Sequence, residues 1–297
     1  MKKQTTHFFS LFCLALCFFT FIFSTQAQEK SNAHMVWKIT SEEGKTGYLL
    51  GSVHMAKPEL FPLDSIYYEV FDKADIIGFE VNLDSLLIET QALLPKYGLY
   101  PTGESLKDHL SEETFKKLED YMSSFGVPIV TMLQMKPWII ASSFSALELQ
   151  KSGYSIEGID QHFFNKAKDK NKKIIGLETT EFQMKIFAEM PEKEQIDFLE
   201  YSLENAKESV ESIDEIMRFW EIGDAENLHQ LMEGGMEEFS HEVYEDIIIN
   251  RNKNWIPKIQ QLMQDHTPLI IVGVGHLVGE NSVNDLLTKE GYQVKQL

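Results

Sequence analysis

Short apolar runs bounded by polar, turn-forming residues are the most regular pattern along this chain. They lie at residues 35–39, 48–52, 76–81, 173–177, 267–272 and 292–294. Apolar runs of this length between turn residues predict buried strands. The segment 42–47, which is rich in Glu, Gly and Lys, has the chemistry of a hairpin loop between the first two strands.

Helices are predicted between several of these strands. Asp64 and Ser111 are good N-caps, and each precedes apolar residues at helical spacing. A third helix is expected at residues 137–150, because Pro137 favours the first turn of a helix. Strands that alternate with helices in this way predict an α/β fold.

Residues 178–246 depart from this alternation, since their pattern is helical throughout, with Pro191 and Asp224 marking helix starts. The stretch holds 21 acidic residues against four basic ones. Its clearest apolar stripe consists of Ile196, Leu199, Leu203 and Ala206. We interpret the stretch as an acidic, all-helical insertion with solvated faces, within one domain over residues 28–297. An acidic recognition surface is the alternative.

The first 27 residues have the pattern of a secretory signal peptide. Lys2 and Lys3 precede an apolar run at residues 8–23, and small residues follow at Thr25 and Ala27. The run is short for a membrane span of about 20 apolar residues, so an uncleaved anchor is the less favoured alternative. We therefore expect export to a periplasm or out of the cell, with no stable membrane insertion after cleavage.

Charge and cysteine content narrow the functions further. Lys and Arg number 27 and Asp and Glu number 46, which gives a formal net charge of −19. So acidic a chain is poorly suited to neutralising phosphates, and we expect no nucleic-acid partner. Cys13 and Cys17 are the only cysteines and lie in the predicted signal peptide, so the mature chain would contain no disulfide and no thiolate ligand.

Two Gly-x-x-His elements each close a predicted strand, one at residues 51–54 and the other at residues 273–276. In open α/β sheets the carboxyl ends of the strands form the ligand crevice, so both elements are expected at one site. Glycine at such a point lets the backbone approach a ligand closely. The expected substrate-binding residues are Gly51, Ser52, Gly273 and Gly275. The alternative is two separate loop histidines, each hydrogen-bonded and inert.

A carboxylate in an apolar strand completes a candidate metal site. Glu80 lies in the run 76–81, where a carboxylate is costly to bury unless it is paired or metal-bound. Two imidazoles and one carboxylate form a known catalytic zinc set, so His54, Glu80 and His276 are the candidate ligands. Such an ion would acidify water and polarise a substrate carbonyl. A strand-end Glu80 that reaches solvent or a loop backbone is the alternative.

Glu178 and Arg251 are the candidate catalytic side chains. Glu178 ends the predicted strand 173–177 and could be a further ligand or the general base; a carboxylate held by helix-start N–H groups is the alternative. Arg251 could clamp a carboxylate or stabilise an oxyanion, and an ion pair with the acidic helices is its alternative. Asp160 could also have a functional role, and N-capping of a helix is the alternative.

Taken in order, these motifs resemble the TraB/GumN family, which includes the TIKI proteases of animals. The matching segments are 36–38, 51–54, 79–81, 136–138, 158–160, 176–179 with Gln183, 251–252 with Trp255, and 272–277. Each short motif is weak alone. The ordered set covers about residues 35–297 and is specific.

The resemblance implies a fold similar to the TIKI, erythromycin-esterase and ChaN-like proteins, with a central mixed β-sheet flanked by helices. It implies a secreted or periplasmic metal-dependent hydrolase, foremost a peptidase acting on a peptide or protein, that uses manganese or cobalt. The residue types alone suit zinc or iron as well. When the functional positions of the family are carried over to this sequence, the resemblance implies His54, Glu80 and His276 first, followed by Glu178 and Arg251. Neither the substrate nor the oligomeric state follows from the sequence.

Two other functions stay open at this point. A non-catalytic protein could use the same residues to sequester a peptide, haem or a metal, and the ChaN-like relatives make haem or iron binding conceivable. An acidic structural or interaction protein would use the motifs only for folding. The paired Gly-x-x-His elements and the carboxylate in an apolar strand favour hydrolysis over both.

Overall fold

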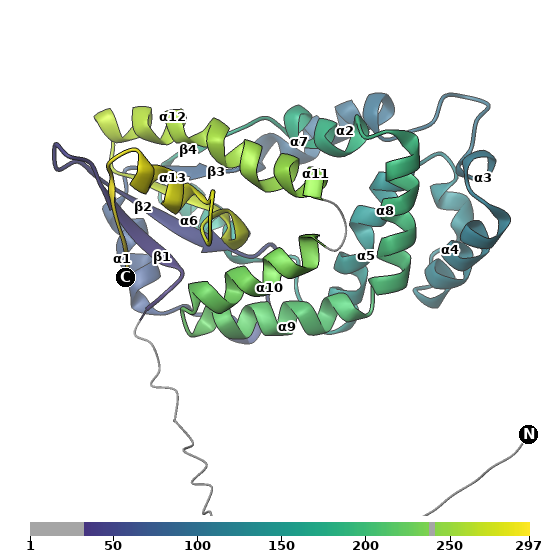
Figure 1. The fold of residues 1–297 in the computed structure, drawn as a ribbon, viewed down its shortest axis with the longest axis horizontal. Coiled ribbons are helices and arrows are strands. Elements are labelled where there is room, and N and C mark those ends of the chain that lie inside the picture. Colours follow the sequence, from purple (N-terminus) through teal and green to yellow (C-terminus); the bar gives the residue numbers. More distant parts are fainter. Residues whose placement is uncertain (1–32, 238–240) are drawn as a thin grey trace, which may run out of the picture. The chain divides into compact units, whose positions relative to one another are not determined.

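Six strands form one sheet in the computed structural model, which describes residues 33–237 and 241–297. They are β1 (Val36–Thr40), β2 (Thr46–Ser52), β3 (Ile76–Phe79), β4 (Lys173–Gly176), β5 (Pro268–Gly273) and β6 (Gln293–Gln296). The order across the sheet is β4-β3-β5-β2-β1-β6, and helices flank the sheet (Figure 1). The pairs β1–β2 and β1–β6 are antiparallel, whereas β2–β5, β3–β5 and β3–β4 are parallel. The predicted α/β fold with a central mixed sheet is confirmed.

Each predicted strand is present, and its ends lie within two residues of the predicted ones. The first two strands form the expected hairpin, since β1 and β2 are consecutive and antiparallel. The predicted signal peptide, residues 1–27, lies outside the described residues. Among the residues that are described, no helix is both long enough and apolar enough to cross a membrane.

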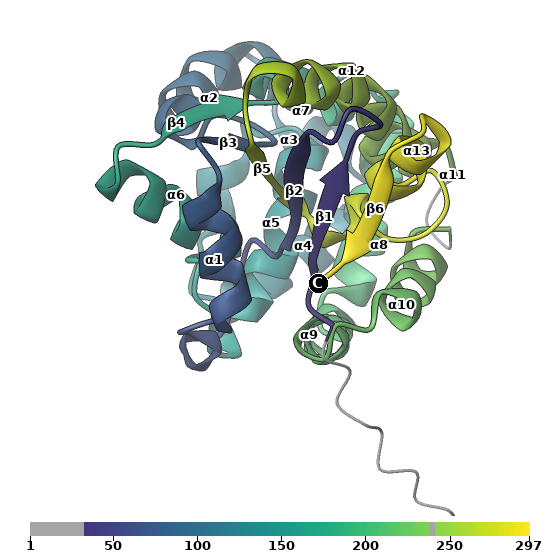
Figure 2. The same ribbon diagram turned by 90° about the vertical axis from the view of Figure 1, so that its left-hand side faces the viewer.

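Helices cover both faces of the sheet (Figure 2). The flanking helices are α1 (Ser65–Lys73), α6 (Ile159–Asp169), α12 (Asn250–Asp265) and α13 (Val283–Lys289). α1 and α6 pack together on one face, where the ring centroids of Phe71 and Phe163 are 5.4 Å apart. Phe79 of β3 contacts Phe164 on the same face. Because side chains alternate along a strand, Glu80 points to the opposite face, toward α12.

α12 supplies a continuous buried face on its side of the sheet. Trp255, Ile259 and Met263 follow one another at intervals of four residues and are all buried. This helix was not among the predicted elements, although such spacing is the pattern of a buried helical face. A π-helical turn at Glu245–Ile249 leads into α12.

Most of the remaining helices lie beyond one end of the strands (Figure 1). They are α2 (Leu83–Tyr97), α3 (Leu106–His109), α4 (Glu112–Ser124), α5 (Pro137–Lys151), α7 (Thr180–Ala188), α8 (Glu192–Asn205), α9 (Glu208–Glu221), α10 (Ala225–Glu237) and α11 (His241–Tyr244). Leu118, Phe144 and Leu199 belong to a second hydrophobic cluster here, separate from the core around the sheet. The described part of residues 178–246 is mostly helical, as predicted.

The two predicted N-caps behave differently. Ser111 precedes α4, and its Oγ accepts the N–H of Thr114 at 3.0 Å. Asp64 precedes α1 as predicted, but its carboxylate is 3.1 Å from the His34 ring instead of capping the helix. The sequence therefore identifies both helix starts but not the partner that each side chain chooses.

Candidate functional site

The strand pairing brings the two Gly-x-x-His elements and Glu80 to one edge of the sheet. Ser52 at the end of β2 lies opposite Gly273 at the end of β5, and β3 pairs with β5 on its other side. The N–H of Gly273 donates to Glu80 Oε1 at 2.8 Å. A Cβ atom at Gly273 would lie 3.3 Å from that oxygen, so a larger residue would crowd the carboxylate.

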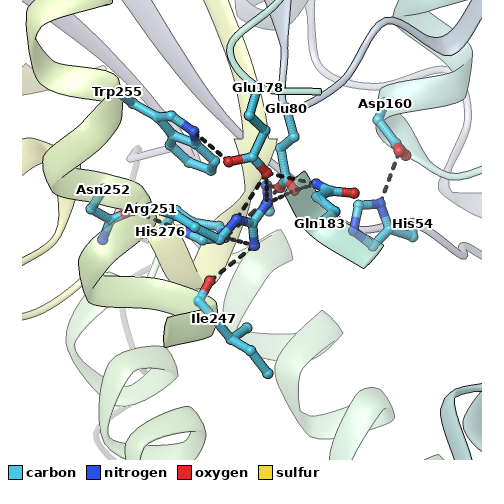
Figure 3. A network of polar contacts seen from close by, with 11 residues as sticks. His54, Glu80, Asp160, Glu178, Gln183, Ile247, Arg251, Asn252, Trp255 and His276 are labelled. Atoms are coloured by element: carbon cyan, nitrogen blue, oxygen red, sulfur yellow. Dashed lines mark hydrogen bonds and ion pairs between the residues drawn. The ribbon is translucent and has the colours of Figure 1, made fainter. Parts of the chain in front are cut away.

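Arg251 from the first turn of α12 joins two buried carboxylates (Figure 3). Its Nη2 donates to Glu80 Oε2 and lies 2.7 Å from Glu178 Oε1, and its Nε is 2.9 Å from the same Glu178 oxygen. Nη1 donates to the carbonyl of Ile247 in the π-helical turn at 2.9 Å. The exposed fractions of the Arg251, Glu80 and Glu178 side chains are 7%, 12% and 5%. A buried ion pair is tolerated when further hydrogen bonds satisfy it, as they do here.

Glu178 is held by four hydrogen bonds. In addition to the two from Arg251, its Oε1 accepts from Gln183 Nε2 at 2.8 Å and its Oε2 from Trp255 Nε1 at 2.9 Å. Three of the four donors converge on Oε1, and Oε2 accepts from Trp255 alone. The contacts themselves fix the guanidinium of Arg251 in place.

His276 is buried behind Glu80, and its tautomer follows from one contact. Its Nδ1 is 2.7 Å from Asn252 Oδ1, an acceptor, so Nδ1 carries the hydrogen and the lone pair of Nε2 accepts a hydrogen bond from Arg251. That Nε2 faces Arg251 Nη1 at 3.2 Å and lies 3.9 Å from Glu80 Oε1. Burial lowers the pKa of His276 to about 3, with Glu80 opposing the shift and Arg251 adding to it. The ring is therefore neutral near pH 7.

Glu80 is ionised although it is buried. Burial by itself raises the pKa of its carboxyl, but attraction to His276 and Arg251 outweighs burial and lowers the pKa to about 2. Because the His276 ring is neutral near pH 7, Arg251 is the permanent positive charge that keeps this carboxylate ionised.

His54 has a different environment, since 69% of its side chain is exposed. Its Nδ1 is 2.9 Å from Asp160 Oδ2, and this hydrogen bond raises the pKa of His54 to about 9. In Figure 3 this pair lies on one side of Gln183, and Arg251 lies on the other. Asp160 contacts Nδ1 of His54 and leaves the other ring nitrogen, Nε2, outside the pair.

Gly158 explains how Asp160 reaches His54. A Cβ atom at Gly158 would lie 2.1 Å from the carbonyl oxygen of Val53, so only glycine lets α6 begin against that backbone. The N–H of Ile159 donates to the same oxygen at 2.9 Å. Gly158 occupies the N-cap position of α6, so the alternative of Asp160 as the N-cap is wrong.

A cavity of about 240 Å³ is bordered by both His54 and Glu80. It is lined by Ser52, His54, Phe79, Glu80, Val81, Leu83, Leu86, Asp160, Gln183 and Ile271, and we call it the Ser52 cavity. Its polar end contains two buried atoms that have no hydrogen-bond partner in the described part of the chain, Ser52 Oγ and Asp160 Oδ1. Arg251, Glu178 and His276 are not among the lining residues.

Of the four residues expected to bind substrate, Ser52 alone lines this cavity. A Cβ atom at Gly51 would lie 2.7 Å from Val274 Cγ2, and one at Gly275 would lie 2.5 Å from Met232 Cε. The Gly51 carbonyl accepts from the indole of Trp220 at 2.8 Å. Gly51 and Gly275 therefore permit close packing, and Gly273 holds Glu80.

Asn252, Trp255 and Gln183 received no individual role from the sequence, yet each holds a site residue in place. Arg251 and Trp255 are four residues apart, one turn of α12, so both reach Glu178. That helical spacing was available in the sequence. The acceptor role of Asn252 and the π-helical turn have no comparable pattern.

The donor set suits a divalent metal ion. Both imidazoles are held through Nδ1 by an oxygen acceptor, which is how proteins commonly orient metal-binding histidines. The 3.9 Å between His276 Nε2 and Glu80 Oε1 is within reach of two metal–ligand bonds of about 2.1 Å each, but an ion bonded to Nε2 would have to displace the Nη1 donor of Arg251. Within the described residues, no three His, Cys, Asp or Glu side chains are already gathered as a complete ligand group.

The charge of the site also suits a cation. Glu80, Glu178 and Asp160 contribute three negative charges, and Arg251 with protonated His54 contributes two positive ones. The cluster therefore keeps one net negative charge among largely buried side chains. A divalent ion would replace the proton of His54, because a ligand nitrogen must be deprotonated.

Comparison with known proteins places this site in a family context. The sequence profile of the TraB/PrgY/gumN family matches residues 35–296. Two similar relatives, from Shigella flexneri and Escherichia coli (strain K12), both carry the name "Uncharacterized protein YbaP". Each is 25% identical over 258 residues, which cover 86% of this chain and 93% of the relative. No solved structure matches the chain.

Proposed function

This chain belongs to the TraB/PrgY/gumN family, and on that premise we propose that it is an exported, metal-dependent hydrolase that cleaves peptide bonds. One observation carries the proposal: two imidazoles, each oriented through Nδ1, and one ionised carboxylate lie around a single edge of the sheet. A hydrolase needs such groups held in place beside a space for substrate, and two of the three, His54 and Glu80, line the Ser52 cavity.

His54, Glu80 and His276 would hold the ion, with manganese or cobalt implied by the family and zinc suited to the same ligands. When bound, the ion supplies Lewis acidity, which stabilises charge on a carbonyl oxygen and lets water attack near neutral pH. In the hydrolysis, the water oxygen bonds to the carbonyl carbon, the carbon–nitrogen bond breaks, and the leaving amine gains a proton.

The remaining residues orient and balance charge. Asp160 and Asn252 each hold one imidazole through its Nδ1, and Arg251 holds Glu80 in its ionised form. Glu178 acts as the positioning residue of Arg251, since its oxygens already accept four hydrogen bonds. Asp160 Oδ1 is buried on the cavity wall without a partner, and it takes the proton that the attacking water loses.

Export is the second half of the proposal. We expect cleavage after Ala27, so the exported chain should begin at Gln28. Mass spectrometry of the protein recovered from the periplasm or the culture medium measures this directly. An intact mass that still includes residues 1–27 would argue for an uncleaved anchor instead.

Metal binding tests the site before any substrate is known. Purified residues 28–297 include the whole compact unit 31–297 and are stripped of metal, then titrated with Mn²⁺, Co²⁺ and Zn²⁺ in a calorimeter. We expect one ion per chain, lost in His54→Ala and in His276→Ala. His266→Ala is the matched control, because that histidine pairs with Asp75 away from the site.

Turnover is then tested with a peptide library and each metal ion. Hydrolysis that requires the ion and disappears in both site variants supports the proposal. Binding that ignores either histidine contradicts the metal site. Stoichiometric binding without cleavage of any peptide would favour a sequestering protein over a hydrolase.

A further inference from the structure

The Ser52 cavity has an apolar wall that the hydrolytic groups do not explain. Phe79, Val81 and Ile271 form its buried part, with exposed fractions of 2%, 5% and 1%. Leu83 and Leu86, both partly exposed, complete the wall from the start of α2. An apolar cavity of about 150 Å³ holds a benzene ring, so about 240 Å³ accommodates a leucine, methionine or phenylalanine side chain with space left beside it.

The polar end of the cavity calls for a hydrogen-bonding ligand. Ser52 is 2% exposed, and its hydroxyl has no partner among the described residues. A buried hydroxyl left unpaired is destabilising, and a ligand with a donor or acceptor removes that cost. An amino-acid residue in a peptide combines the two features required, an apolar side chain and a polar peptide group next to it.

Several exposed apolar side chains are also close along the chain to residues of the cavity. Five large apolar side chains of the described residues are exposed: Leu87, Ile88, Val130, Ile156 and Phe182. All except Val130 lie within four residues of a cavity-lining residue along the chain. Ile156 follows Ser155, which bridges to Ala56 just after His54. Exposed apolar side chains next in the chain to cavity residues are consistent with a binding surface at the cavity mouth.

Resting on the proposed function, we infer that the Ser52 cavity is the specificity subsite of the hydrolase. It binds the apolar side chain of a residue beside the scissile bond, of leucine, methionine or phenylalanine size, and Ser52 hydrogen-bonds the peptide group of that residue. The polar end holds the bond to be cleaved, while the side chain lies against Phe79, Ile271 and Leu86. Glycine, aspartate and lysine at this position leave the wall empty or bring a charge against it.

The test uses short acetylated and amidated peptides that differ at one position, with Leu, Met, Phe, Gly, Asp or Lys, in the presence of Mn²⁺. Mass spectrometry identifies the cleaved bond, and kcat/KM is measured for each peptide. We expect kcat/KM for the apolar residues to exceed that for glycine by at least about tenfold. Leu86→Glu should lower the ratio of kcat/KM for the leucine peptide to that for the glycine peptide by about tenfold. Val130→Glu is the matched control, since Val130 is 68% exposed and not part of the cavity.

A binding measurement separates this inference from the proposed function. N-acetyl-leucinamide and N-acetyl-glycinamide are added to the protein while the methyl signals of Leu83 and Leu86 are followed by NMR. Saturable shifts with the leucine compound alone support the subsite even where no peptide is cleaved, in which case the hydrolase proposal fails and the subsite stands. Cleavage without an apolar preference overturns the subsite but not the hydrolase. No cleavage and no selective shift overturn both.

Discussion

The two Gly-x-x-His turns share one spacing and follow neighbouring parallel strands, yet their histidines have opposite properties. His276 is buried, and burial lowers its pKa to about 3. His54 is exposed, and its hydrogen bond to Asp160 raises its pKa to about 9. Ser52, not Gly51, lies opposite Gly273, so the two motifs are also offset by one residue.

The difference comes from elements far away in the sequence. His276 lies in the 3₁₀ turn Val274–His276 and meets Asn252 of α12, whereas His54 lies on an open loop and meets Asp160 of α6. The motif therefore determines where a histidine is placed, and its distant neighbours determine its charge. In the metal-free protein one histidine is a neutral acceptor and the other a cation.

The largest expected loss of stability comes from the buried cluster around His276. Arg251→Met would leave Glu80 and Glu178 without their cation in a largely buried setting. Breaking a buried ion pair costs about 3–5 kcal/mol, and we expect that loss in the free energy of unfolding measured in urea. Arg218→Met, in an exposed pair with Glu215, should cost less than about 1 kcal/mol. Equal losses in the two variants would mean that the Arg251 cluster is not buried in solution.

Removing each histidine compares the two turns directly. His276→Ala removes a buried ring and leaves Asn252 Oδ1 without its donor, which should cost about 2–4 kcal/mol of unfolding free energy. His54→Ala removes an exposed ring and should cost about 0.5 kcal/mol or less. Thermal or urea unfolding of the metal-free variants gives both values. Similar costs for the two would contradict the asymmetry.

Gly158→Ala should disturb the environment of the exposed histidine, His54, by shifting the backbone of α6. The new methyl group would lie 2.1 Å from the Val53 carbonyl oxygen, so α6 would have to move away from the His54 loop. Overpacking of this kind costs about 1–3 kcal/mol. Asp160 would move with the helix, so the pKa of His54 should fall toward 6.5 while that of His276 stays low. An unchanged His54 pKa would show that the Asp160 contact does not depend on Gly158.

Much of the fold could be predicted from the sequence because its signals are local. Six apolar runs of strand length predicted six strands, and the alternation predicted the α/β class. α12 was not predicted, although Trp255, Ile259 and Met263 have helical spacing. α2 was also missed, and it supplies Leu83 and Leu86 to the cavity.

The position of the site was predictable in part. The strand-end rule anticipated that His54, Glu80 and His276 would approach the same edge of the sheet. The partner of each histidine could not be predicted, because Asn252 and Asp160 reach the two histidines from helices 24 and 106 residues away in sequence. The role of each glycine depends on what packs against it: Val274 against Gly51, Glu80 against Gly273 and Met232 against Gly275. No local sequence pattern indicates that packing.

The smallest expected change in stability, and the sharpest test of the comparison, comes from Asp160→Asn in the metal-free protein. His54 is largely exposed, so its pair with Asp160 should contribute about 0–1 kcal/mol to the unfolding free energy, and the variant should lose that contribution. The pKa of His54, about 9 with Asp160 present, should fall toward 6.5, whereas that of His276 should stay near 3. NMR of the imidazole signals from pH 3 to 10 measures both.

The raised pKa of His54 stabilises the fold below about pH 6.5, and this is lost as the pH rises through about 9. The lowered pKa of His276 has the opposite sign: its contribution is complete above about pH 6.5 and is lost as the pH falls toward about 3. Asp160→Asn should therefore remove the alkaline loss and keep the acidic one. Loss of both, or of neither, would mean that the two histidines do not titrate as separate groups.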